Sequence, residues 1–142
     1  MYSKALMISA VALAATLGLS LSASAEVMKM KADLSAASEV PPTKSDGKGT
    51  ADITYDTTSK KLSWKLNYTG LTGPATMAHF HGPASVTENH APAVPIPDPK
   101  SGTEGSATLN DAQAKDLMDG KYYVNVHTDA NKGGEIRGQV TK

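Results

Sequence analysis

The chain has 142 residues, and its 14 lysines and arginines are balanced by 14 aspartates and glutamates, so the formal net charge is zero. This balance argues against a nucleic-acid partner, because a surface that binds phosphates needs an excess of basic residues. The sequence contains no cysteine, which excludes disulfide bonds and thiolate metal ligands.

The first 25 residues have the pattern of a secretory signal peptide. Lys4 precedes an apolar stretch over residues 5–21, and the small residues Ala23-Ser24-Ala25 form a cleavage box. We therefore expect cleavage after Ala25, export to the periplasm or the extracellular space, and a single mature domain over residues 26–142. An uncleaved N-terminal anchor is the alternative. No second apolar stretch reaches the length of a membrane span, so we expect no membrane attachment once the leader is removed.

Alternating apolar and polar residues predict strands in the first half of the domain, over residues 28–34, 51–55 and 62–68. The second and third of these form a predicted hairpin with one apolar face. Trp64 lies on that face and is expected in the core.

The second half of the domain contains shorter strand patterns, over residues 76–81, 105–109, 122–127 and 135–140. A proline-rich stretch over residues 82–103 is predicted to be irregular. One helix is expected between the N-cap Asn110, with Gln113 at the capping-box position, and the stop at Gly120. Many short strands and one short helix predict an all-β fold, an antiparallel β-sandwich or barrel.

Four histidines form a candidate metal site. His79 and His81 stand two residues apart on a predicted strand and therefore point to the same face. On the strand over residues 122–127, His127 belongs to the face opposite the valines, and His90 lies on the proline-rich loop. Four imidazoles favour copper, with zinc as the alternative metal. We expect one copper ion held by His79, His81 and His127, with His90 as the weakest ligand.

Arg137 is the fifth candidate site residue. It shares a strand face with Glu135 and Gln139, and glycines flank this segment. A fixed cation near a metal attracts small anions, which would give Arg137 a catalytic role. The other interpretation is a surface pair of Glu135 and Arg137 that contributes little.

Four motifs resemble the CHRD domain family, named for its occurrence in chordin and also found in stand-alone bacterial secreted proteins. They are Glu39-Val40-Pro41-Pro42, Ala78-His79-Phe80-His81-Gly82-Pro83, residues 120–127 and residues 134–140. The resemblance runs from about Lys31 to Val140. It implies a β-sandwich, and for much of the family it implies no settled activity.

The order of the histidines and the arginine is also similar to that in copper/zinc superoxide dismutases. In that family an HxH pair, a loop histidine and a late-strand histidine hold copper, and an arginine guides the anion. The fold of that family is a Greek-key β-sandwich, so the similarity implies an antiparallel Greek-key β-sandwich here. It also implies a copper-only site with superoxide as substrate and Arg137 as the anion guide.

Three functions follow from these patterns. The first is an exported copper enzyme that disproportionates superoxide. The second is a copper or zinc protein for buffering or delivery, without turnover. The third is an adhesion or interaction module in which the histidines are structural and the proline-rich loop is the contact surface.

Overall fold

A computed structural model of the chain describes residues 24–142. Nearly all of the predicted leader, residues 1–23, lies outside the described residues. No helix within residues 24–142 is long and apolar enough to cross a membrane. The elements in chain order are β1 (Val27–Ser35), η1 (Ala36–Ser38), β2 (Lys48–Asp56), β3 (Lys61–Thr69), β4 (Ala75–His81), β5 (Pro92–Ile96), β6 (Thr103–Thr108), α1 (Asp111–Met118), β7 (Tyr123–Thr128) and β8 (Ile136–Gln139).

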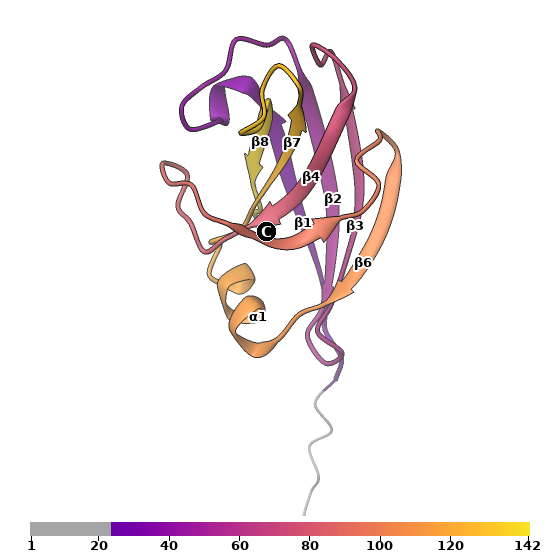
Figure 1. The fold of residues 1–142 in the computed structure, drawn as a ribbon. Helices are drawn as coiled ribbons and strands as arrows, with labels where there is room; N and C mark the ends of the chain where they lie inside the picture. The colour runs from indigo at the N-terminus through magenta and orange to yellow at the C-terminus, as the bar shows by residue number, and fades with distance from the viewer. Residues whose placement is uncertain (1–23) are drawn as a thin grey trace, which may run out of the picture.

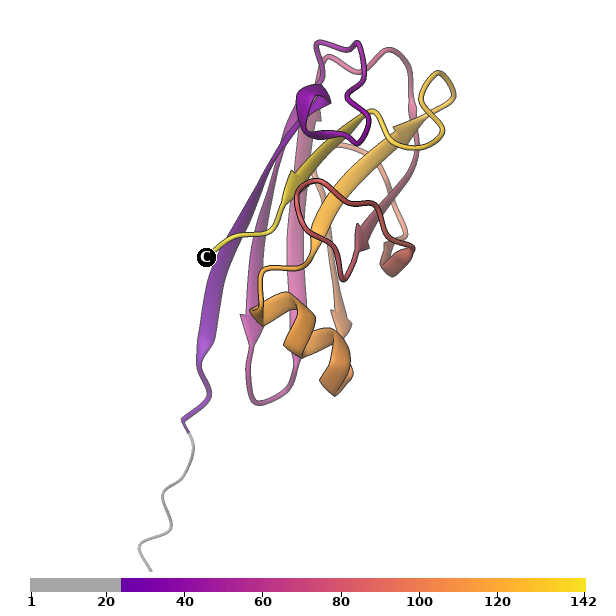
Figure 2. The same cartoon turned by 90° about the vertical axis from the view of Figure 1, so that its left-hand side faces the viewer.

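The eight strands form one antiparallel sheet in the order β5-β4-β7-β8-β1-β2-β3-β6. The sheet folds over on itself, so that its two halves face each other (Figures 1 and 2). Trp64 on β3 and Phe80 on β4 meet across this interior, with ring centroids 5.3 Å apart. Four strands separate β3 from β4 in the sheet order. The predicted all-β antiparallel fold is confirmed, and its two layers are halves of a single curved sheet.

The core lies between the two halves of the sheet and follows the predicted alternation. Leu62, Trp64 and Leu66 on β3 are buried, as are Val124 and Val126 on β7. Helix α1 lies at the end of the sheet opposite η1 (Figure 1).

The predicted helix is confirmed with its capping box. Asn110 accepts a hydrogen bond from the Gln113 backbone, and the Gln113 side chain accepts one from the Asn110 backbone. Leu117 is fully buried in the core. The helix therefore begins and ends where its sequence signals predict.

One strand was not predicted. β5 lies inside the proline-rich stretch, where the sequence indicated irregular structure. It contains Pro92 and Pro95, and it is an edge strand that pairs only with β4. Proline is tolerated there because an edge strand leaves one side of its backbone unpaired.

All six residues of β7 are buried, because both of its faces are covered. Val124 and Val126 face the core, whereas Tyr123, Asn125 and His127 point to the outer side of the sheet. Two loops contribute to the cover of this outer side, residues 82–91 and the segment after η1. The outer face of β7 and β8 and the adjoining end of β4 at His81 therefore form a buried polar layer, and the candidate site lies at its edge.

Candidate metal centre

Strands β4 and β7 bring three of the four histidines together. The ring nitrogens that His79, His81 and His127 can offer to a metal all lie within 4.8 Å of one another. His79 Nδ1 and His127 Nε2 are 3.3 Å apart. His81 and His127 are 5 % and 6 % exposed, whereas His79 is half-buried, so one side of the cluster faces solvent.

Strand register explains this arrangement. His79 and His81 are alternate residues of β4 and share its outer face. Their direct partners on β7 are Asn125 and Tyr123, and His127 lies one step further along the same face of β7. The period of two along each strand therefore predicted the meeting of His79, His81 and His127 correctly.

Backbone carbonyls fix two of the imidazoles. His127 Nδ1 lies 2.8 Å from the Lys132 carbonyl oxygen, and His81 Nδ1 lies 2.8 Å from the His90 carbonyl oxygen. A carbonyl only accepts, so each Nδ1 carries a proton. His127 Nε2 therefore has a lone pair available in the neutral ring, whereas His81 Nε2 is occupied, because it lies 2.8 Å from Asn125 Oδ1. The outer hydrogen bond at Nδ1 is the usual way in which proteins orient a histidine that ligates a metal.

The electrostatics of the cluster favour the neutral imidazole at His79 and His81. Burial lowers the pKa of His79, and the nearby His127 and His81 lower it further. Burial also lowers the pKa of His81, although its contacts with His90 and Asn125 act in the opposite direction. Metal binding requires the neutral ring, so these shifts reduce the competition between protons and a metal ion.

The fourth histidine is placed differently from the other three. The His90 side chain is exposed on the loop and lies outside the group of three. The backbone of His90 contributes to the site instead, because its carbonyl oxygen faces His81 Nδ1 and accepts a hydrogen bond from the Tyr123 hydroxyl. The sequence predicted that His90 lies near the other histidines, but it did not show that the backbone carbonyl, and not the imidazole, contacts the site.

The ring of Tyr123 separates Arg137 from the histidines. The Tyr123 ring stacks on His81 with centroids 4.7 Å apart and an interplanar angle of 3°. The Arg137 guanidinium carbon lies 3.5 Å from the centroid of the same tyrosine ring. Tyr123 belongs to β7, which lies between β4 and β8 in the sheet. His81 and Arg137 therefore contact opposite faces of the Tyr123 ring.

The environment of Arg137 is that of a buried structural residue. It is 1 % exposed, and it donates to the Ser85 carbonyl at 2.9 Å and to Asn89 Oδ1 at 3.1 Å. Glu135 is also fully buried and binds other groups. The interpretation of Arg137 and Glu135 as a surface ion pair is therefore wrong, because loops that are distant in sequence cover both residues.

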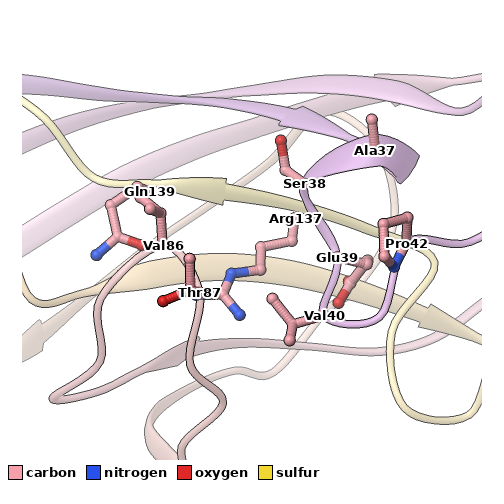
Figure 3. Close-up of a pocket in the computed structure, with 9 residues that line it drawn as sticks. All are labelled: Ala37, Ser38, Glu39, Val40, Pro42, Val86, Thr87, Arg137 and Gln139. Carbon is pink, nitrogen blue, oxygen red and sulfur yellow. The ribbon is translucent and has the colours of Figure 1, made fainter.

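Glu39 completes the polar layer, and it was not predicted as a site residue. With Arg137 it lines a pocket of about 350 Å³ between the segment after η1 and the loop that carries Val86 and Thr87 (Figure 3). A Cβ built on Gly134, where φ is +123°, would collide with Glu39 Oε1 and Asn125 Nδ2, so only glycine allows these two groups to approach here.

The Glu39 carboxyl is 5 % exposed, and its Oε1 has no hydrogen-bond partner among the described residues. Burial raises its pKa from 4.5 to about 7, against the lowering effects of the Arg137 charge and the Asn125 amide. Glu39 therefore holds its proton well above the pH at which a solvated glutamate loses it.

This raised pKa predicts a pH dependence of stability. Between pH 4.5 and 7 the unfolded chain ionises Glu39 while the folded chain keeps it protonated, so Glu39 makes the folded state less stable as the pH rises. A Glu39→Gln variant lacks this titration, and its stability relative to wild type should rise by about 2 kcal/mol across that window. Denaturant unfolding at a series of pH values measures the difference, with the exposed Glu104→Gln as the control. A difference that is constant with pH would contradict the burial argument.

Comparison with known proteins gives one match. No curated protein and no solved structure matches the chain. The model of the CHRD domain matches residues 30–140, which include the motifs around Glu39, His79, His127 and Arg137. The match covers most of the sequence and nearly all of the part that the structure describes, and the chain therefore belongs to the CHRD domain family.

Proposed function

We propose that this protein is an exported copper-binding protein that holds one copper ion between His79, His81 and His127. The observation that carries the proposal is the convergence of three imidazoles, with offered nitrogens within 4.8 Å of one another. His127 already has the outer hydrogen bond to a backbone carbonyl that leaves its Nε2 available. His81 has the same kind of bond at Nδ1, and its Nε2 must exchange the contact with Asn125 Oδ1 for the metal.

Copper is favoured by the chemistry of the donors. Imidazole nitrogen suits copper and zinc, and copper binds a given nitrogen site more tightly than zinc does. Zinc is the alternative metal. Export rests on the signal-peptide pattern of residues 1–25 and agrees with a metal site that contains no oxidisable thiol.

Superoxide dismutation is the second candidate function. It is favoured by the half-buried position of His79, since a reacting anion needs an open coordination position on the solvent side of the metal. Arg137 is buried behind Tyr123. In this candidate it therefore acts as a positioning residue, which holds the loop of Ser85 and Asn89 beside the site.

Metal analysis of the purified protein after copper loading tests the proposal, together with its electron paramagnetic resonance spectrum. We expect one copper per chain and nitrogen hyperfine structure from several imidazoles. A His79→Ala/His81→Ala double variant should lose both signals. Equal copper binding by the double variant and the wild type would end the proposal and leave the interaction module as the better interpretation.

A superoxide-decay assay on the copper-loaded protein separates turnover from storage or delivery. Free copper is held at a fixed level by a chelator, and the double variant gives the background rate. A wild-type rate equal to that background would remove the enzyme candidate and leave copper binding intact.

A further inference from the structure

Met77 is a large apolar side chain exposed beside the histidine cluster. It is 47 % exposed and is one of three exposed large hydrophobic residues among residues 24–142, the others being Val27 and Val86. Ala78 and Phe80 of the same strand are buried in the core. Met77 therefore belongs with His79 and His81 on the outer face of β4.

Strand register places Met77 directly opposite His127. The Cβ atoms of directly opposed residues in an antiparallel pair lie roughly 5 Å apart. The register shifts between Ala75 and Met77, immediately before this pair. Such bulges re-aim side chains and occur often beside functional sites.

The methionine side chain can reach the cluster without disturbing the core. It has three rotatable bonds before its terminal methyl group, and at 47 % exposure it gives up little packing when it moves. His127 Nε2 is directed toward His79 Nδ1 at 3.3 Å. The Met77 thioether can therefore approach a metal held by these two nitrogens from the partly exposed side.

The donor set that results is neutral and soft. The group of ligating side chains consists of histidines alone, with no carboxylate among the described residues that form it. Three neutral imidazoles add no negative charge, and a thioether is a ligand that selects Cu(I) over harder ions. A monovalent copper ion fits this set better than zinc does.

Resting on the copper-binding function proposed above, we propose that Met77 is the fourth ligand of the site and that it makes the site selective for Cu(I). The sulfur comes from the strand that carries His79 and His81, and the donors are three imidazole nitrogens and one thioether. The exposed His90 imidazole is not needed to complete the set.

The test is Cu(I) loading of the purified protein without oxygen, followed by X-ray absorption at the copper edge and competition with a chromophoric Cu(I) chelator. Wild type should show one sulfur neighbour beside its nitrogen neighbours. Met77→Leu keeps the size and apolar character of the side chain but has no sulfur. This variant should lose the sulfur signal and about tenfold in Cu(I) affinity, while its Cu(II) affinity changes less than about twofold. Met28→Leu, on β1, is the matched control and should behave as wild type.

The outcomes separate the two proposals. A nitrogen-only copper environment in wild type, or an unchanged sulfur signal in Met77→Leu, overturns the role of Met77 and leaves the histidine site standing. Failure of the wild type to bind either Cu(I) or Cu(II) overturns both. Thermal melting of each variant shows that the exposed substitution leaves the fold intact.

Discussion

Replacing His127 with alanine should lower copper affinity by roughly 100-fold or more, a loss of about 3 kcal/mol in binding free energy. His127 is 6 % exposed, and the Lys132 carbonyl fixes its Nδ1. Its Nε2 is therefore preorganised toward His79, and the fold has already restricted the motion of this ring. Isothermal titration or chelator competition measures the change.

His90→Ala is the matched control, because it removes an exposed imidazole and keeps the backbone carbonyl that faces His81. We expect its copper affinity to stay within about threefold of wild type, since no ligand bond is lost. Equal losses in His127→Ala and His90→Ala would instead support the four-histidine site expected from the sequence, with the loop closing over the metal.

The strand-borne part of the site could be predicted because it depends on local periodicity. Alternation along a strand places His79 and His81 on one face and His127 on the outer side of β7, and these relations hold wherever the strands lie in the sheet. The pairing of β4 with β7 then brings them together. The same periodicity predicted the core positions of Trp64 and Val124, which are 5 % and 0 % exposed.

The loop-borne part could not be predicted, because it depends on contacts between segments that are distant in sequence. Asn89 Nδ2 donates to the Val40 carbonyl at 2.6 Å, and Asn89 Oδ1 accepts from Arg137. The loop of Asn89 and the segment of Val40 therefore close together over the outer face of β8. No periodic pattern in the sequence shows that loops cover Arg137. The sequence alone therefore allowed the interpretation of Arg137 as an exposed anion guide.

Glu135→Ala should destabilise the fold by roughly 3 kcal/mol or more, because it leaves several buried donors without their shared acceptor. Glu135 is fully buried, and its carboxylate accepts hydrogen bonds from the backbone and hydroxyl of Thr72, from Ser45, from Thr128 and from Asn131. These partners come from the segment before β2, the β3–β4 connection and the β7–β8 turn. One carboxylate thus ties together three loops at the end of the sheet.

The charge of Glu135 is stabilised by these donors. Burial alone would raise its pKa, but the hydrogen bonds from Thr72, Thr128 and Asn131 outweigh burial and lower it from 4.5 to about 2. The contribution of Glu135 to the stability of the folded state is therefore complete above pH 4.5 and is lost as the pH falls toward 2. Glu135→Gln should reproduce much of the loss at neutral pH, because its amide NH₂ would face donors instead of acceptors.

Denaturant unfolding at pH 7 and pH 3 distinguishes this network from a general effect of losing a negative charge. At pH 7 both Glu135 variants should be much less stable than wild type. At pH 3 the difference in stability should narrow, because Glu135 of the wild type is then protonated in the unfolded chain but still ionised in the folded one. Glu104→Gln removes an exposed glutamate that forms a surface ion pair with Lys65 at 3.3 Å, and it should change stability by less than about 0.5 kcal/mol. If Glu104→Gln and Glu135→Gln cost the same, the buried network does not hold the loops. A large loss confined to Glu135 would show that this carboxylate anchors the β7–β8 turn, which supplies the Lys132 carbonyl to His127.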